Sequence, residues 1–322
     1  MWADFASLFF FLSGFLFKEK RLSESFWSVA KKDFISIMVP YFSFTLLIYA
    51  LWVFGFRYYG DNVPWHNEPH LPLQNIFYGS LDKMIHLYMQ LWFLPCLFLT
   101  RRLFWLFGRI PQIQSSVWNR FLLLGGCGVA GWIYAEHFSK RLFWNFDVAW
   151  VCIVFFGAGY YLKNQSWVHD PWTLKKNLTW ILGCAVAQVA MVICNALYFT
   201  SKNYTLLHVD TGYGKYGHPL FFTISAFLGI IVALRLSHLI ASSVTWPQMS
   251  TFIMVIYMLH MVCFEIFKIG LSASCHLSAE QVQLWMQQSF WINLLCALLS
   301  VGVLIKIAPW FRNHLPWMIG HR

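Results

Sequence analysis

Charged side chains are scarce in this chain. Only 11% of its 322 residues are Asp, Glu, Lys or Arg, whereas soluble domains carry about 25%. Because 59% of the residues are hydrophobic, there are too few charges to cover the surface of a water-soluble fold. The scarcity of charge excludes a soluble domain and predicts a protein that crosses the lipid bilayer several times.

Negatively charged residues are rarer than positively charged ones, with 13 Asp and Glu against 23 Lys and Arg. The resulting net charge of +10 is compatible with nucleic-acid binding. A membrane protein, however, collects Lys and Arg in its cytoplasmic loops for orientation, which explains the excess without any polyanion. We therefore expect the lipid bilayer as a partner, and no nucleic acid.

Common catalytic and metal-binding motifs are also absent from the sequence. It contains no GxSxG elbow, no HExxH helix and no P-loop glycine run. His66, Glu68 and His70 lie close together, but Pro69 interrupts their spacing and no third ligand follows at a recognisable interval, so we expect no metal site. Seven of the eight cysteines fall within apolar segments, and their spacing predicts no disulfide framework.

The long apolar segments define the expected fold. Segments of this length in lipid must satisfy their own backbone hydrogen bonds, so they are predicted to be helices. We expect an all-α polytopic bundle that forms one integral-membrane domain over residues 1–322, with about nine membrane-spanning helices. The predicted spans are Phe5–Phe17, Ile35–Phe56, Leu87–Phe107, Phe121–Tyr134, Val148–Leu162, Leu178–Phe199, Leu220–Ile240, Phe252–Ile269 and Phe290–Ile307.

The distribution of Lys and Arg between these spans predicts their orientation. Sixteen of the 23 lie in one set of alternating loops, which is therefore assigned to the cytoplasm together with the C-terminus. The N-terminus is then outside, on an apolar run that is short for a span. We expect one further helix before Met1, which would give ten spans with both ends inside.

Polar residues inside the predicted spans indicate where helices face each other. Cys184, Gln188, Met191 and Asn195 fall on one helical face, and so do Asn293, Cys296 and Ser300. For the Asn and Gln side chains, hydrogen bonds between helices are the simpler expectation. Ser13 and Gly14 form a small pair that predicts close approach of another helix.

Two long loops are predicted on the outer side, at residues 57–86 and 201–219. Their aromatic, glycine and histidine content suits a site for a polar acceptor, although Tyr and Trp are also common at membrane interfaces. In the spans, His260 is a candidate general base or a structural imidazole, with no carboxylate three or four residues away to orient it.

Six short motifs, taken in order, resemble the pattern of the membrane acyltransferase 3 family, and most closely its fucose 4-O-acetylase-like branch. They are LFFFLSGFLF from Leu8, KKDFISIMVPYFSF from Lys31, LWFLPCLF from Leu91, VFFGAGYYLK from Val154, ISAFLGI from Ile224 and VIYMLHM from Val255. The resemblance covers nearly the whole chain.

The resemblance implies an enzyme of the bacterial inner (plasma) membrane that transfers an acyl group, commonly acetyl, from acyl-CoA to a hydroxyl. The acceptor would be a sugar, a glycan or a lipid-linked saccharide, and the donor is a substrate rather than a permanently bound cofactor. On this interpretation Gln90, Trp92 and His260 would line a central cavity, with His260 catalytic. Lys31 and Lys32 would lie near the cytoplasmic entrance for the donor.

The chain departs from the family pattern at one place. Similar proteins have a histidine base just before the FFFLSG string, where this chain has Asp4, Phe5, Ala6 and Ser7. Two alternatives therefore stay open beside the enzyme: an inactive truncated member of the family, and a transporter or flippase of lipid-linked saccharides. The sequence leaves the acceptor, the acyl chain and the oligomeric state open.

Overall fold

The computed structural model describes residues 3–58, 67–170, 172–202, 208–241 and 249–320. Helices account for nearly all regular structure in this part of the chain, and the only β-pairing there is an isolated bridge between Asp210 and Lys215. An all-α polytopic membrane bundle is thus confirmed. Six helices are long and apolar enough to cross a membrane: Phe26–Phe54, Phe143–Leu162, Leu174–Ser201, Pro219–Ile240, Phe252–Cys275 and Phe290–His314.

The chain separates into two compact units. Unit 1 contains Met1–Ala30 and Cys96–Thr245, and unit 2 contains Lys31–Pro95 and Trp246–Arg322. The expectation of a single domain over residues 1–322 stays a prediction.

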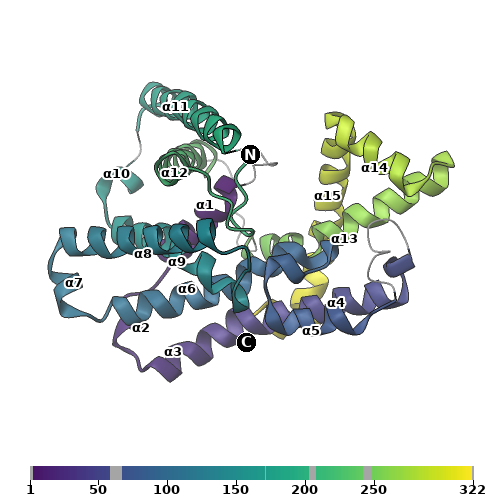
Figure 1. The fold of residues 1–322 in the computed structure, drawn as a ribbon, viewed down its shortest axis with the longest axis horizontal. Helices are drawn as coiled ribbons and strands as arrows, with labels where there is room; N and C mark the ends of the chain where they lie inside the picture. Colours follow the sequence, from purple (N-terminus) through teal and green to yellow (C-terminus); the bar gives the residue numbers. More distant parts are fainter. Residues whose placement is uncertain (1–2, 59–66, 171, 203–207, 242–248, 321–322) are drawn as a thin grey trace. The chain divides into compact units, whose positions relative to one another are not determined.

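Unit 1 is built around α9, the most buried of its helices. The unit contains α1 (Ala3–Phe15), α2 (Lys20–Ser23), most of α3 (Phe26–Asp33) and of α6 (Phe93–Phe107), α7 (Pro111–Ser115), α8 (Val117–His137), η6 (Phe143–Asn145), α9 (Phe146–Leu162), α10 (Ser166–His169), α11 (Leu174–Ser201) and α12 (Pro219–Ala241). Helices α1 and α8 pack on α9, and α11 packs along α12 (Figure 1).

Glycine allows α1 and α9 to approach each other very closely. A methyl group on Gly14 would overlap the carbonyl oxygen of Phe156, and one on Gly159 would overlap the carbonyl oxygen of Phe11. The prediction that Ser13 and Gly14 admit a close neighbour is confirmed. In lipid the hydrophobic effect does not drive helices together, so close van der Waals packing of this kind stabilises their association.

Unit 2 contains the remaining helices. They are the π-helical turn η1 (Phe34–Met38), α4 (Val39–Phe54), η2 (Phe56–Tyr58), α5 (His70–Tyr78), η4 (Leu81–Lys83), η5 (His86–Trp92), α13 (Met249–Cys275), α14 (Ala279–Gln288), α15 (Phe290–His314) and η7 (Pro316–Ile319). The π-turn lies just before Pro40, whose ring crowds the carbonyl four residues earlier, so local widening of the helix relieves that clash.

The predicted outer loop at residues 57–86 contains α5, which three tyrosines tie to the unit. The hydroxyls of Tyr41, Tyr49 and Tyr88 donate to the carbonyls of Ile76, Pro69 and Pro72 at 2.7, 2.9 and 3.0 Å. His66, part of the cluster for which we expected no metal, lies outside the described residues.

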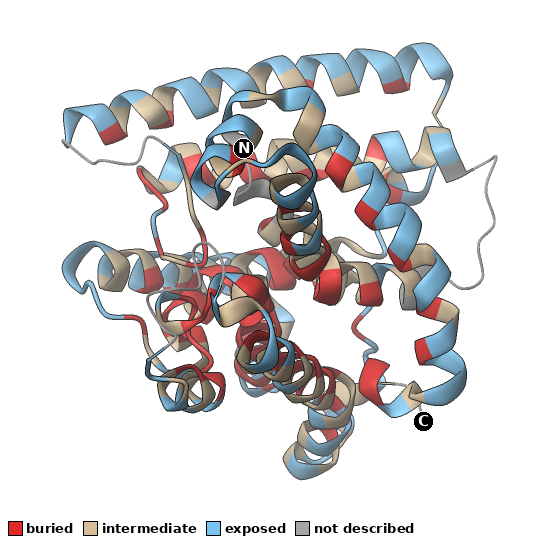
Figure 2. Ribbon diagram, turned by 90° about the vertical axis from the view of Figure 1, so that its right-hand side faces the viewer, coloured by how far each residue is buried: buried red, intermediate tan, exposed pale blue. Residues whose placement is uncertain are grey.

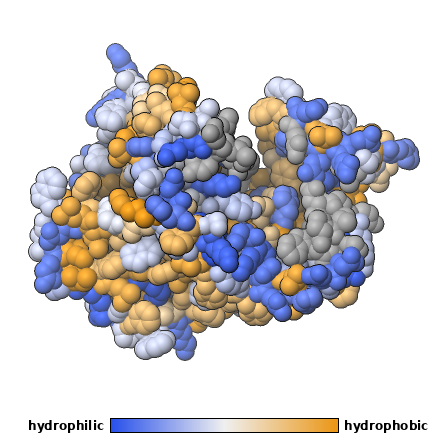
Figure 3. All heavy atoms as spheres, in the orientation of Figure 1, coloured by the Kyte–Doolittle hydropathy of each residue, from blue (hydrophilic) through white to orange (hydrophobic). Residues whose placement is uncertain are grey.

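Burial follows the sides on which helices face each other (Figure 2). The predicted faces of α11 and α15 are confirmed, since Cys184, Asn195, Cys296 and Ser300 are buried. Large apolar side chains are exposed along α8, α11 and α15, and Figure 3 shows apolar patches among polar ones on the face in view. Exposed apolar surface of this extent is what lipid contact requires.

Three of the nine predicted spans have a different form. The first is the short helix α1, and the fourth lies within α8, which is 21 residues long but not among the six long apolar helices. The third, Leu87–Phe107, was expected to be one helix. Instead the 3-10 helix η5 ends at Trp92 and α6 begins at Phe93, which places Pro95 in the first turn, where a missing N–H costs nothing.

Candidate functional site

The structure brings Gln90, Trp92 and His260 to the same part of unit 2, because η5 packs on α13. The Gln90 side-chain amide nitrogen lies 3.4 Å from the carbonyl oxygen of Met258, and the Tyr257 hydroxyl donates to the backbone carbonyl of Gln90. Trp92 is buried, whereas Gln90 and His260 are half-buried. Their roles in catalysis and substrate binding stay predictions.

The surroundings of His260 define which of its ring nitrogens carries the proton. Nδ1 lies 2.9 Å from the carbonyl oxygen of Tyr257 and 3.2 Å from that of Ile256. Both oxygens can only accept, so Nδ1 is the donor and a neutral ring leaves its lone pair on Nε2. Backbone carbonyls of α13 therefore orient the ring, in place of the carboxylate that the sequence lacks.

The two polar side-chain atoms of Gln90 differ in their hydrogen bonding. Its Nε2 atom is near the carbonyls of Met258 and Leu87, but its buried Oε1 atom has no hydrogen-bond partner among the described residues. A buried amide oxygen without a partner costs free energy unless water or a ligand satisfies it.

Lys31 and Lys32, in the last turn of α3, are exposed.

Helix α13 also carries an ion pair that the sequence did not suggest. The Nζ atom of Lys268 lies 3.5 Å from Oε2 of Glu265, with both side chains almost fully buried. The three-residue spacing places the two groups on one face of the helix.

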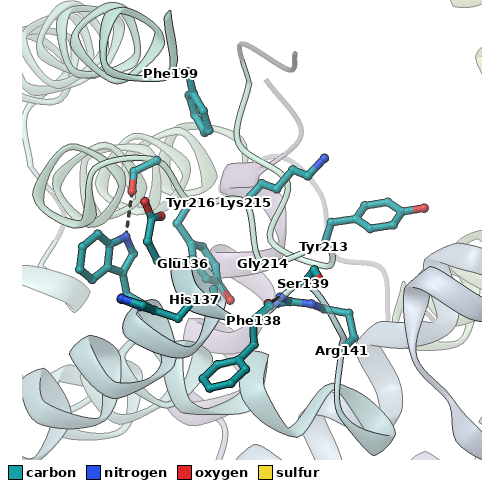
Figure 4. A pocket seen from close by; sticks show the side chains of 13 residues that line it. Glu136, His137, Phe138, Ser139, Arg141, Phe199, Tyr213, Gly214, Lys215 and Tyr216 are labelled. Carbon is teal, nitrogen blue, oxygen red and sulfur yellow. Dashed lines mark hydrogen bonds between the residues drawn. The ribbon is translucent and has the colours of Figure 1, made fainter. Parts of the chain in front are cut away.

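Unit 1 contains a pocket of about 360 Å³ at the end of α8, which the sequence analysis did not identify as such (Figure 4). Its walls come from two segments far apart in the sequence, with Phe199 of α11 beside them. They are Trp132, Ala135, Glu136, His137, Phe138, Ser139 and Arg141, and then Tyr213, Gly214, Lys215, Tyr216 and Gly217. None of the residues predicted for the site lines this pocket.

A buried ion pair fixes the first wall of the pocket. The Nη1 atom of Arg141 lies 2.7 Å from Oδ2 of Asp147, and Nη2 donates to the carbonyl of Phe138 at 2.8 Å. The backbone N–H of Leu142 donates to the other Asp147 oxygen at 3.0 Å. Together these bonds position the segment between α8 and α9.

The second wall of the pocket is the segment around the turn between Asp210 and Lys215, which hydrogen bonds hold in place. Its ends are joined by the bridge between Asp210 and Lys215, with both N···O distances 2.8 Å. The Trp132 indole donates to the Gly217 carbonyl at 2.9 Å, the hydrogen bond drawn in Figure 4. Gly214 has a φ of 65° and touches the Arg141 guanidinium, so a side chain there would be strained and would clash.

Asn195 of α11 supports this turn from behind. Its Nδ2 atom donates to the Tyr216 carbonyl at 3.0 Å, and its Oδ1 atom accepts from the His218 N–H at 2.8 Å. We expected Asn195 to bond to a neighbouring helix. It binds the loop before α12 instead, because that loop folds back against α11.

Comparison with known proteins decides the family. An acyltransferase domain, that of the acyltransferase 3 family, matches residues 5–308. The chain belongs to this family. No curated protein and no solved structure matches the chain. The match and the apolar helices together identify a membrane acyltransferase.

Proposed function

We propose that this acyltransferase transfers an acyl group, acetyl in the first instance, from acyl-CoA to a hydroxyl of a sugar, glycan or lipid-linked saccharide. The family match and the membrane helices support a membrane acyltransferase. The excess of Lys and Arg in alternate loops supports an orientation with the C-terminus in the cytoplasm, where acyl-CoA is available.

The observation that carries the proposal is the position of His260 Nδ1, 2.9 Å from the carbonyl oxygen of Tyr257 and 3.2 Å from that of Ile256. Since Nδ1 is bonded to backbone carbonyls, Nε2 can accept a proton from the acceptor hydroxyl as the hydroxyl oxygen attacks the thioester carbonyl. A C–O bond forms, the C–S bond breaks, and the CoA thiolate takes up the proton from His260. Acceptor ester and free CoA are the products.

The other predicted residues have supporting roles in this proposal. The spare Oε1 atom of Gln90 would accept a hydrogen bond from the acceptor, and Trp92 would provide an apolar surface beside it. The exposed ammonium groups of Lys31 and Lys32 would attract the phosphates of the donor.

The test is acyl transfer from radiolabelled acetyl-CoA to the glycan and lipid fractions of membranes that contain the protein. We expect His260→Ala to lower the rate by about 10²- to 10⁴-fold, the usual contribution of a general base. His314→Ala is the matched control, because its Nδ1 atom also lies 3.0 Å from the carbonyl four residues earlier, in the exposed last turn of α15. Full activity in His260→Ala would exclude this base.

A further inference from the structure

None of the residues that the proposed reaction uses lines the pocket of unit 1. His260, Gln90 and Trp92 belong to unit 2, whereas every residue that lines the pocket belongs to unit 1. Its volume of about 360 Å³ lies in the range of small-molecule sites. The pocket therefore needs an explanation of its own.

The pocket is already built without a ligand. The Arg141–Asp147 pair fixes one wall, and the Trp132 indole and the Asn195 amide fix the other through bonds of 2.9 Å and 2.8–3.0 Å. Binding a ligand therefore costs little conformational entropy in these walls, which favours affinity.

One residue of the lining has a buried polar atom without a partner. Tyr216 is 2% exposed, yet its hydroxyl has no hydrogen-bond partner among the described residues. Burial raises the pKa of Tyr216 well above its usual value, so its hydroxyl stays protonated and can both donate and accept. Orphaned groups of this kind are normally satisfied by water or by a ligand.

The chemistry of the lining selects the class of ligand. Trp132, Phe138, Phe199, Tyr213 and Tyr216 provide aromatic surfaces, and Glu136, His137, Ser139 and Lys215 provide donors and acceptors at the rim. Arg141 is paired with Asp147, and the lining contains one further cationic side chain, Lys215, and one carboxylate, Glu136. Aromatic surfaces with a few hydroxyl, carboxylate and ammonium groups, and with no excess of charge, suit a ring that has apolar C–H faces and many hydroxyls.

We propose that this pocket binds a neutral saccharide. The pocket and its ligand class rest on the walls described above and do not depend on the proposed function. Acyl-CoA is a poor fit, because its phosphates need a surplus of positive charge that this lining does not have. The Lys and Arg count also assigns both pocket segments to the outer side, opposite the donor.

Direct binding is the first test, measured without acyl-CoA on protein in lipid nanodiscs. Saturation-transfer NMR with the methyl glycosides of glucose, galactose, fucose and N-acetylglucosamine reports contact with each sugar, and methyl glucuronide is the anionic comparison. We expect at least one neutral glycoside to bind in preference to the glucuronide. The proposal is overturned when no neutral glycoside binds, or when only the glucuronide does.

Two variants locate the binding. Ser139→Trp places a large ring at the pocket rim and is expected to weaken binding at least about tenfold, whereas Ser115→Trp, at an exposed position of α7 away from the pocket, should leave it unchanged. Tyr216→Phe removes only the buried hydroxyl and should weaken binding by about five- to tenfold, the effect of one lost hydrogen bond. Sugar binding that neither Ser139→Trp nor Tyr216→Phe weakens would lie elsewhere and would refute this site.

The transfer assay separates this proposal from the proposed function. Ser139→Trp should lose sugar binding whatever its rate of acyl transfer, because binding is measured without acyl-CoA. Sugar binding that Ser139→Trp leaves intact in an active enzyme would refute the pocket and leave the acyltransferase reaction intact. Binding that is lost in Ser139→Trp, in a protein that transfers no acyl group, would support the pocket and refute the reaction.

Discussion

The Nη1 atom of Arg141 lies 2.7 Å from Oδ2 of Asp147, and only 4% and 1% of the two side chains are exposed. A pair this deeply buried is costly to desolvate, and removing one partner leaves the other charge unpaired. Because Arg141 also bonds to Phe138 and Asp147 to Leu142, the pair joins the end of α8 to the start of α9.

Asp147→Asn should therefore destabilise the protein by about 3–5 kcal/mol, since the Arg141 charge stays buried without a counter-charge. The measurement is thermal unfolding in detergent micelles. Glu19→Gln is the control, because Glu19 is 65% exposed and lies 3.2 Å from Lys163, and it should cost less than about 1 kcal/mol. Equal and small effects of both changes would show that the Arg141–Asp147 pair does not stabilise the fold.

Gly159→Ala tests the close contact between α1 and α9. The added methyl group meets the backbone of Phe11, which cannot rotate away, so the helices must separate. We expect a loss of about 1–3 kcal/mol in the same unfolding measurement. Gly183→Ala adds the same group to α11 where nothing lies within 4 Å, and it should be neutral or stabilising by about 0.5–1 kcal/mol. A neutral Gly159→Ala would contradict the backbone contact.

Gln90→Leu tests whether the spare amide oxygen contacts substrate. Leucine has a similar volume but cannot accept a hydrogen bond, so kcat/KM for acyl transfer should fall by about 5- to 100-fold, corresponding to roughly 1–3 kcal/mol. Gln288→Leu, an exposed position in α14 of the same unit, should leave kcat/KM unchanged. If both variants keep full kcat/KM, Gln90 has no part in binding the substrate.

The sequence predicts features that depend on local pattern. The run of apolar residues is enough to predict helices such as α11, and the spacing of Cys184 and Asn195 is enough to predict its buried face. The change from 3-10 helix to α-helix after Trp92 was not predicted, because the apolar run continues from Leu91 to Leu99 across this point. Pro95 is the one local signal that could have placed the start of α6 there.

The candidate sites depend more on tertiary contacts. Gln90 and His260 could be named from the sequence as polar residues of predicted spans, and the fold brings η5 against α13, but the role of the backbone carbonyls around His260 has no sequence signal. The pocket of unit 1 could be anticipated only as a long outer loop at residues 201–219. Its pairing with the segment after α8 requires the contact between Gly214 and Arg141, residues more than 70 positions apart, which spacing alone does not predict.

A final prediction concerns Arg235, which is fully buried near the end of α12. Its guanidinium carbon lies 3.7 Å from the centre of the Trp172 ring, and Nη2 donates to the carbonyl of Trp167. These contacts hold α10 against α12. Arg235→Met keeps the length of the side chain and removes both the hydrogen bond and the cation–π contact.

The amides of residues 168–170, which close the turns of α10, should therefore exchange hydrogen for deuterium about 10- to 100-fold faster in Arg235→Met, as measured by mass spectrometry, while α9 exchanges as before. Lys175→Met, which removes an exposed charge from the first turn of α11, should change nothing. His238 provides a second tether, since its Nε2 atom lies 2.7 Å from the Val168 carbonyl. Arg235 and His238 bond to the adjacent carbonyls of Trp167 and Val168. Faster exchange in His238→Phe but not in Arg235→Met would show that the His238 contact, and not the Arg235 contact, holds α10 in place.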